Sequence, residues 1–336
     1  MADMVQAQKK IALLHRYQKN SIKETNAAFP YLEAKGIDVL TFKQFDRLGG
    51  FGKFWKGLLW IFYAPLLVIG RGYNVIYCDD SYPFYPALVK IASPRSKIVI
   101  RLGDLHLLYY YKGFAYEILH FFEEIGWSIA DRIIVISEAM AERLIKEGYE
   151  CEVVPDPVDP SDFPQEITQE EGSVMFHGVL TKNKNIGILL QAARLLPKVR
   201  FSIVGSGPDL RRLMDVAPSN VHFQGWVPFK DIHHQIGSCS VGIALRSDNP
   251  GNEYVVTSPF LQYGIMGKPC LVTRRKVFGD YKWQFSDVYQ LATQIKGLLS
   301  DPDYLRSEGE KLRENIFKNH HANKIADQIW QILTQV

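Results

Sequence analysis

The sequence predicts an α/β fold made of two domains, each built on a parallel β-sheet covered by helices. The chain has 336 residues, which is enough for two domains of ordinary size with a core each. Strand-like apolar runs alternate with helix-like segments in both halves, and this order favours parallel sheets because parallel strands need crossover helices. An acidic, proline-rich stretch at residues 155–171 is typical of an interdomain linker. Two such halves are expected to leave a cleft between them, facing the carboxyl ends of both sheets.

Composition restricts the functions open to the chain. Hydrophobic residues make up 47% and charged residues 22% of the sequence, which are globular values, and the net charge of +3 is too small to indicate a nucleic-acid partner. The four cysteines (Cys78, Cys151, Cys239 and Cys270) are scattered without C-x-x-C spacing. They indicate a reducing compartment, with neither a disulfide framework nor a zinc site. The apolar run before His15 is too short for a signal peptide, so we expect a cytoplasmic protein.

The first half is predicted to contain five strands, at residues 11–14, 37–42, 73–78, 97–102 and 131–136. After the first strand, Ser21 and Glu24 match a capping box that opens a helix to about Lys35, and Pro30 is expected to kink this helix. Ser137 is a favourable N-cap for a helix that follows the fifth strand.

Polar residues follow the third and fourth predicted strands. Asp79 and Asp80 end the third strand, and Asp104 and His106 come directly after the fourth. Ligands of open α/β sheets bind beyond the carboxyl ends of the strands, so chemistry can be expected at these positions. Two adjacent carboxylates point in different directions and no third ligand is apparent, so we predict no metal site here.

Residues 51–70 are apolar nearly all round, and Lys53 and Lys56 are their only charged residues. The stretch is too short and too interrupted for a transmembrane helix. Two interpretations stay open: a helix buried in the core, or a face that lies on a membrane surface. A second aromatic cluster at residues 107–122 adds modest support to the membrane interpretation.

The second half repeats the strand and helix order. A strand that ends at Gly178 is followed by a helix at residues 186–196, so Lys184 lies near a helix N-terminus where an anion could bind. A strand at 201–204 leads through a glycine-rich turn into a helix at 209–217, whose buried face is predicted to be Leu210, Leu213, Met214 and Ala217. A G-x-G-x-x-G fingerprint would need glycine at position 210, which argues against a dehydrogenase.

A third motif occupies residues 252–273, after a strand that ends near Arg246. Ser258 is a good N-cap, Pro259 suits the first helical position, and Gly267 marks the helix end before a buried strand. The free N–H groups and dipole of such a helix can hold phosphate or carboxylate. An ordinary connector between helix and strand is the alternative interpretation. A helical tail is predicted at residues 303–336.

The order of these motifs resembles the family-4 retaining glycosyltransferases of the GT-B fold. The resemblance covers about residues 130–273 and is carried by five segments: ADRIIVISEAMAERLIKEGYECEVVPDPVDPSDF, FHGVLTKNKNIGILLQA, FSIVGSGPDL, VHFQGWVP and NEYVVTSPFLQYGIMGKPCLVT. It implies two Rossmann-like domains: an acceptor domain at 1–160, a linker at 161–172 and a donor domain at 173–315. It further implies a C-terminal helix at 316–336 that packs near the first domain.

The resemblance also implies an activity. It is the metal-independent transfer, with retention, of a sugar from a UDP- or GDP-linked donor to a glycan or lipid-linked acceptor, as in polysaccharide biosynthesis, with no cofactor. Without Mg²⁺, the leaving diphosphate must be stabilised by lysine or arginine and by helix N-terminal N–H groups. The membrane surface is a further expected contact, through residues 51–70.

Individual roles follow from the matched motifs. The residues implied in donor binding are Gly178, Lys184, Gly205, Ser206, Gly207, Trp226, Val227, Arg246, Glu253, Tyr254, Val255, Val256, Thr257 and Gln262. Catalytic roles are implied for Lys184 at the diphosphate, for Glu253 at the transferred sugar, and for Asp104 or His106 at the acceptor. Arg101 and Asp80 are expected on the acceptor side.

Three departures from the family pattern leave a second function open. Val179 stands where the family usually has arginine, Gln262 where it has a ribose-binding glutamate, and Gly103 where it has a histidine. Gln262 can still hydrogen-bond ribose hydroxyls, and Arg246 could supply the missing charge. The alternative is a non-catalytic nucleotide-sugar-binding or scaffold subunit.

Overall fold

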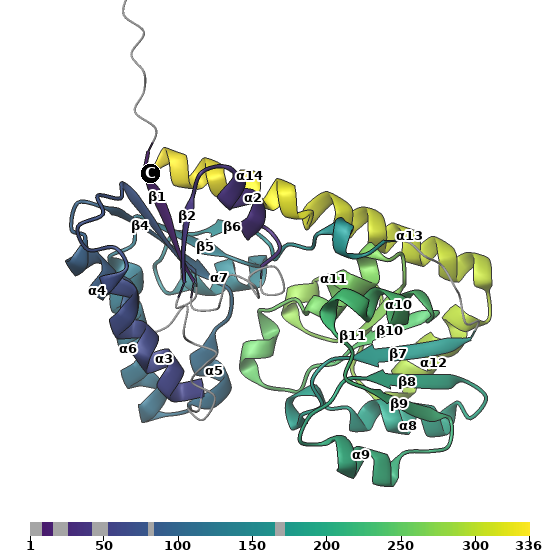
Figure 1. The fold of residues 1–336 in the computed structure, drawn as a ribbon. Coiled ribbons are helices and arrows are strands. Elements are labelled where there is room, and N and C mark those ends of the chain that lie inside the picture. The colour runs from purple at the N-terminus through teal and green to yellow at the C-terminus, as the bar shows by residue number, and fades with distance from the viewer. Residues whose placement is uncertain (1–8, 16–25, 42–52, 80–83, 165–171) are drawn as a thin grey trace, which may run out of the picture. The chain divides into compact units, whose positions relative to one another are not determined.

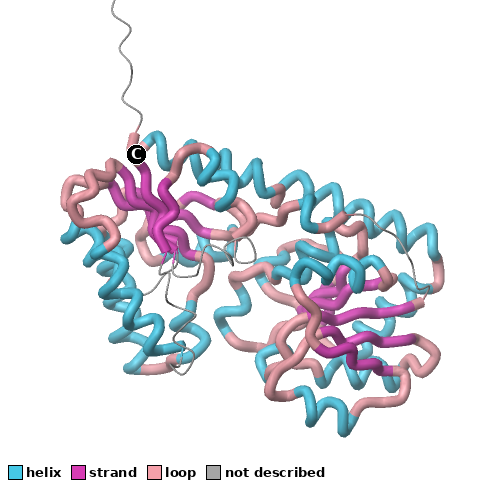
Figure 2. The backbone as a smooth tube through the Cα atoms, viewed as in Figure 1, coloured by secondary structure: helices cyan, strands magenta, loops and turns pink. Residues whose placement is uncertain are grey.

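The chain forms two compact units, each with a six-stranded parallel sheet (Figure 1). The computed structural model describes residues 9–15, 26–41, 53–79, 84–164 and 172–336. The first unit comprises Met1–Pro157 together with Ala322–Val336, and the second comprises Val158–His321. Figure 2 shows the strands of each unit gathered into one sheet with helices around it. These units confirm the predicted α/β fold class.

The first unit has the strand order β2-β1-β3-β4-β5-β6. Its strands are β1 (Ile11–His15), β2 (Asp38–Thr41), β3 (Val75–Asp79), β4 (Lys97–Leu102), β5 (Arg132–Val135) and β6 (Glu152–Val153). Its helices are α2 (Phe29–Ala34), α3 (Lys53–Leu66), α4 (Tyr85–Ala92), α5 (His106–Tyr110), α6 (Phe114–Ser128), α7 (Glu138–Lys146) and α14 (Ala322–Gln335). The five predicted strands are confirmed, and the short β6 was not predicted.

The C-terminal helix completes the core of the first unit. Ile325, Ile329 and Leu333 of α14 share one buried cluster with Leu13 of β1 and Tyr77 of β3. The same helix packs on α2. Because successive side chains of a strand point to opposite faces, alternate residues of the strands line the face that α2 and α14 cover.

Helix α3 is buried on one side and exposed on the other. Trp60 and Ala64 are fully buried, whereas Leu59, Phe62 and Leu66 are exposed. A purely buried helix is therefore the wrong description of this stretch. Across residues 9–15, 26–41, 53–79, 84–164 and 172–336, no helix is long and apolar enough to cross a membrane.

The second unit has the strand order β12-β11-β10-β7-β8-β9. Its strands are β7 (Ser173–His177), β8 (Arg200–Val204), β9 (Val221–Gly225), β10 (Val241–Ala244), β11 (Cys270–Thr273) and β12 (Gln284–Phe285). Its α-helices are α8 (Gly187–Leu195), α9 (Leu210–Val216), α10 (Ile232–Gly237), α11 (Ser258–Ile265), α12 (Val288–Leu299) and α13 (Pro302–Asn319). Short 3₁₀ turns are η3 (Pro160–Asp162), η4 (Lys182–Lys184), η5 (Phe229–Asp231), η6 (Pro250–Glu253) and η7 (Lys276–Phe278).

Both faces of the second sheet are buried. Phe176 of β7 and Ile243 of β10 lie in a cluster with α8 and α12, whereas Met175 and Ala244 lie in a second cluster with α10, α11 and α13. Consecutive residues of one strand thus reach opposite faces, which explains why the central residues of these strands are all apolar.

The structure corrects two local predictions, and a third is not tested by it. Pro30 occupies the first turn of α2, where proline is tolerated, and produces no kink. Met214 is 53% exposed, because α9 buries Leu213 but reaches the sheet with only part of its predicted apolar face. The predicted capping box at Ser21 and Glu24 lies outside the described residues.

The predicted helical tail is two helices, α13 and α14, which belong to different units. The break falls at His320 and His321, where the N–H of Val158 donates to the carbonyl oxygen of His320 at 2.7 Å and Val158 pairs with His321 as a β-bridge. The helix predicted at 316–336 is therefore divided: its first residues belong to α13, and α14 packs in the first unit as expected. All four cysteines are free thiols.

Candidate functional site

The second sheet changes the direction of its winding between β7 and β10. The chain runs from β7 to β8 and β9 on one side, then returns to place β10, β11 and β12 on the other. Ligands of open α/β sheets bind at such a switch point, beyond the carboxyl ends of the strands. The loops after β7 and β10 meet there, because the N–H of Ser247 donates to the carbonyl oxygen of Asn183 at 2.9 Å. Lys184 follows Asn183 and Arg246 precedes Ser247, so each cation is the chain neighbour of a residue in this hydrogen bond.

Glycines allow the loops after β7 and β8 to touch through their backbones. A Cβ on Gly205 would lie 2.0 Å from the carbonyl oxygen of Gly178, and one on Gly207 would lie 2.4 Å from the carbonyl oxygen of Leu180. The N–H of Leu180 also donates to Ser206 at 2.9 Å. Gly205 has a φ of +141°, which strongly favours glycine. Contact between two loops of the protein is therefore enough to explain Gly205 and Gly207.

Lys184 lies close to the end of β7. It is the last residue of η4, and Asn185 follows in a left-handed conformation with φ of 48°. Burial, with the positive charge of Lys184, lowers the pKa of His177 to about 3. His177 is thus neutral at physiological pH, and its ring packs edge-on against Tyr263 with 5.0 Å between centroids. Its Nε2 atom is buried without a hydrogen-bond partner among the described residues.

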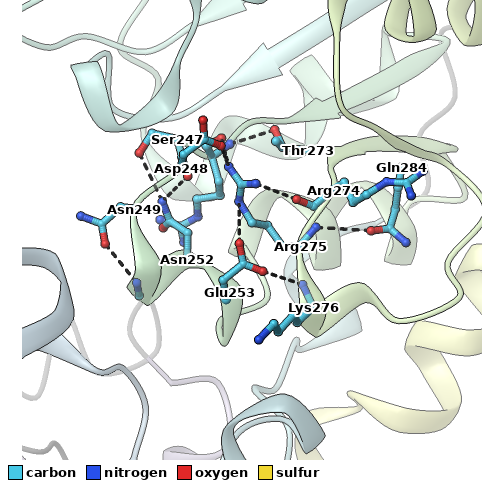
Figure 3. Close-up of polar contacts among 12 residues, drawn as sticks. Ser247, Asp248, Asn249, Asn252, Glu253, Thr273, Arg274, Arg275, Lys276 and Gln284 are labelled. Atoms are coloured by element: carbon cyan, nitrogen blue, oxygen red, sulfur yellow. Dashed lines mark hydrogen bonds and ion pairs between the residues drawn. The ribbon is translucent and has the colours of Figure 1, made fainter. Parts of the chain in front are cut away.

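Arg275, which was not predicted as a site residue, stabilises the loop after β10. Arg275 donates to Asp248 Oδ1 at 2.8 Å, to the carbonyl oxygen of Arg246 at 3.1 Å and to that of Arg274 at 2.7 Å. Its Nε lies 3.8 Å from Oε1 of Glu253 (Figure 3). Only 9% of its side chain is exposed. Arg275 therefore joins the ends of β10 and β11.

Both carboxylate oxygens of Glu253 have a partner. Beside its contact with Arg275, Oε2 accepts the N–H of Lys276 at 2.9 Å (Figure 3). The preceding residue, Asn252, is buried and donates to the carbonyl oxygen of Ser247 at 2.9 Å. Asn249 caps η6 by accepting the N–H of Gly251 at 3.0 Å. The loop that was predicted to contact the sugar is thus fixed from both ends.

Thr257, not Ser258, is the N-cap of α11. Its Oγ1 accepts the N–H of Phe260 at 3.3 Å, and Ser258 is the first helical residue. Both residue types cap well, so the sequence could not separate neighbouring positions. The other predicted donor residues on this segment are Tyr254 and Val256, which are half-buried, Val255, which is buried, and Gln262, which is half-buried on α11. Val227 is half-buried, whereas Trp226 is 69% exposed beyond β9.

The first unit carries a buried ionic cluster at the carboxyl end of its sheet. Asp79 accepts Nη1 of Arg101 on Oδ1 at 3.1 Å and contacts Nδ1 of His15 with Oδ2 at 2.7 Å. The other Nη of Arg101 pairs with Asp156. Burial opposes the charged form of Arg101, but Asp156 and Asp79 raise the pKa of the guanidinium. His15 and Asp156 were not predicted as site residues. Their positions are like that of Asp79, since His15 ends β1 and Asp156 follows β6.

The remaining acceptor-side predictions lie near this cluster along the chain. Asp104 is half-buried, and its Oδ1 accepts the N–H of Leu105 at 2.8 Å. His106 begins α5, and Asp80 lies outside the described residues. No group of three or more His, Cys, Asp or Glu side chains able to hold a metal occurs in the part of the chain that the structure describes.

Two family models match the chain in order. One, described as Glycosyl transferases group 1, matches residues 171–301, and the other, described as Glycosyltransferase Family 4, matches residues 27–162. No curated protein sequence matches significantly.

Solved structures share the fold. Sucrose-phosphate synthase (tll1590) from Thermosynechococcus elongatus superposes with a TM-score of 0.77 at 16% identity, over 98% of this chain and 99% of that chain. HepE (Alr3699) from Anabaena, in complex with UDP, has a TM-score of 0.74 at 15% identity, over 98% and 100%. TarM from S. aureus has a TM-score of 0.60 at 15% identity, over 77% and 55%.

These matches favour an enzyme over the non-catalytic alternative. The two models together span most of both units, and the fold is that of GT-B proteins. The chain therefore belongs to the family-4-like, group 1 glycosyltransferases.

Proposed function

We propose that this glycosyltransferase takes a nucleotide-diphosphate sugar on its second unit and transfers the sugar to a glycan or lipid-linked acceptor held by the first. The observation that carries the proposal is the meeting of the loops after β7 and β10 at the switch point, which brings Lys184 and Arg246 to one edge of the sheet. Cations at this edge suit the charge that develops on a leaving diphosphate.

The proposed mechanism gives each part of this edge a role. Lys184 stabilises the leaving diphosphate, and the N-terminus of α11 offers further N–H donors to phosphate. The braced loop with Glu253 binds the transferred sugar. We propose retention of configuration without a metal on the strength of the motif order, and a role in polysaccharide synthesis on the same ground.

The choice of donor is part of the proposal. HepE has been solved with UDP and with UDP-glucose, which makes uridine-linked sugars the first to test and guanosine-linked sugars the second. Thermal unfolding with UDP-glucose, UDP-N-acetylglucosamine, GDP-mannose and the free sugars tests donor binding. A ligand that binds only the folded state at 100 times its Kd adds about 2.7 kcal/mol of stability. We expect one nucleotide sugar to raise the melting temperature, and no shift with any of them would overturn the proposal.

A second part of the proposal is contact between the first unit and an anionic membrane surface. Helix α3 exposes Leu59, Phe62 and Leu66 at helical spacing, and α6 exposes Phe114, Ile118 and Phe121 in the same way. Phe62 is 63% and Phe114 81% exposed. Both helices pack on α4. Exposed apolar stripes of this kind suit the interface of a bilayer.

Charge favours lipid as the occupant of the α3 stripe. All charged residues from position 47 to position 78 are basic: Arg47, Lys53, Lys56 and Arg71. Basic residues beside an apolar helix face attract anionic lipid headgroups. We accordingly propose a cytoplasmic protein that works at the inner face of the membrane.

Vesicle co-sedimentation tests the membrane contact. Wild-type protein should sediment with phosphatidylglycerol vesicles at low salt, and both Phe62→Asp and Phe114→Asp should reduce the bound fraction. Val216→Asp on α9, an equally polar change at a 50% exposed site of the second unit, is the matched control. Wild-type protein that stays in the supernatant would contradict the proposal. Loss of a dimer in Phe62→Asp without loss of sedimentation would assign the stripe to contact between copies instead.

A further inference from the structure

We propose that Arg246 is the second cation of the diphosphate site, and that Arg275 leaves it free for this task by taking up the neighbouring carboxylates. This inference rests on the proposed function and names a residue that binds the leaving group. It concerns three arginines that lie within thirty residues of the chain, Arg246, Arg274 and Arg275.

Both terminal nitrogens of Arg275 are hydrogen-bonded to the protein. Its guanidinium donates to two carbonyl oxygens and to Asp248, and its Nε faces Glu253 at 3.8 Å (Figure 3). The Asp248 side chain is 99% exposed and that of Glu253 29% exposed, and both carboxylates pair with Arg275. Both terminal nitrogens of Arg275 thus donate to protein acceptors, and in the described part of the chain its buried Nε has only the carboxylate of Glu253 opposite it.

Arg246 differs from Arg275 in its ion pairs, although the Nε of each is buried without a hydrogen-bond partner among the described residues. The side chain of Arg246 forms no ion pair with any residue that the structure places, and its Nε is buried without a hydrogen-bond partner. A buried donor without an acceptor lowers stability, so an incoming oxygen anion gains from satisfying it. The planar guanidinium fork matches phosphate oxygens in pairs.

The backbone holds Arg246 in place beside Lys184. The N–H of Arg246 donates to Oγ1 of Thr273 at 3.1 Å, and its carbonyl oxygen accepts from Arg275. The next residue, Ser247, is tied to Asn183, the neighbour of Lys184. Lys184 and Arg246 therefore lie on two loops that are joined by a hydrogen bond at the switch point of the sheet.

The position directly after Gly178 does not supply this charge. Val179, directly after Gly178, is 58% exposed and carries none, and Lys182 is exposed at the other end of η4. A single lysine is a point charge, whereas a diphosphate presents several oxygens over a wider area. Arg246 supplies the second charge in the geometry that a diphosphate needs.

Calorimetric titration separates the diphosphate from the rest of the ligand. The probes are UDP, UMP and uridine, with GDP, GMP and guanosine in parallel. The proteins are wild type, Arg246→Gln, Arg246→Lys and Arg274→Gln, the last an exposed arginine on the same edge. A charge-assisted hydrogen bond lost from a buried site corresponds to about 10- to 100-fold in affinity.

We expect Arg246→Gln to weaken binding of the nucleoside diphosphate by about 10- to 100-fold. Its nucleoside affinity and its melting temperature without ligand should match the wild type. Arg246→Lys should recover part of the loss, and Arg274→Gln should bind the diphosphate as the wild type does.

Two failures can be told apart. Equal diphosphate affinity in Arg246→Gln and wild type would overturn this inference while leaving the proposed function intact. A wild type that binds neither UDP nor GDP would overturn the proposed function and this inference with it.

Discussion

Arg101 and Asp79 form a buried ion pair in the first unit, with Nη1 of the arginine 3.1 Å from Oδ1 of the aspartate. Their side chains are 7% and 6% exposed, and the pair extends to His15 on one side and to Asp156 on the other. The pair links the ends of β3 and β4, so Arg101 stabilises the edge of the sheet at which an acceptor is proposed to bind.

Replacing Arg101 with methionine should destabilise the first unit strongly. The substitution leaves two carboxylates facing each other without their cation, and breaking one side of a buried pair costs about 3–5 kcal/mol. Lys97→Met is the matched control on the same strand, because Lys97 pairs with Asp131 while 53% exposed. Such a surface pair contributes at most about 1 kcal/mol. Urea unfolding measures the free energy of unfolding of both variants. Equal unfolding midpoints would show that the buried pair contributes no more stability than the surface pair.

Gly205→Ala should disturb the contact between the loops after β7 and β8. Its Cβ would lie 2.0 Å from the carbonyl oxygen of Gly178, and its φ of +141° is unfavourable for alanine. Backbone strain alone costs about 1–3 kcal/mol, and the clash adds to it. Gly187→Ala, where a Cβ would meet nothing within 4 Å, is the control and should be neutral or slightly stabilising. Thermal unfolding compares the two, and an unchanged melting temperature for Gly205→Ala would refute the close approach.

His177 should make the second unit less stable in acid. Burial and the charge of Lys184 lower its pKa from 6.5 to about 3 in the folded state. Between pH 6.5 and about pH 3 this histidine is protonated in the unfolded chain and neutral in the folded chain. The free energy of unfolding therefore falls as the pH drops below about 6.5. The slope approaches about 1.4 kcal/mol per pH unit until the folded pKa is reached.

The variant His177→Phe should remove this contribution to the slope. Lys184→Met should keep most of it, because burial is the larger cause of the shift. The measurement is the free energy of unfolding in urea from pH 7 to pH 4. Parallel curves for the wild type and His177→Phe would contradict a neutral, buried imidazole.

The fold was predictable because the apolar runs are long and regularly spaced. The strand that ends at His177 and the one from Val241 to Ala244 are buried on both faces, and a continuous apolar run is the signal of such a strand. Gly267, with φ of +67°, was likewise readable as a helix end.

The polar contacts of the candidate site could not be predicted from the sequence. Arg275 reaches Asp248 across 27 residues and His15 reaches Asp79 across 64, and the spacing of residues does not indicate which charges meet over such distances. The break at His320 was missed for a similar reason, since it depends on pairing with Val158 and has no glycine or proline to mark it. Arg275 was therefore overlooked, while Arg246 was noticed only because a strand was predicted to end near it.

The central claim is that Lys184 stabilises a leaving nucleoside diphosphate, and donor turnover tests it most directly. Release of UDP from UDP-glucose, or of GDP from GDP-mannose, is measured with and without an acceptor extract for wild type, Lys184→Ala and Lys182→Ala. The control lysine, Lys182, lies exposed in the same 3₁₀ turn.

We expect Lys184→Ala to lose about 10²- to 10³-fold in rate, as for the removal of one group that stabilises developing charge. Its melting temperature should stay close to that of the wild type, and Lys182→Ala should turn over at the wild-type rate. Full activity in folded Lys184→Ala would contradict the account.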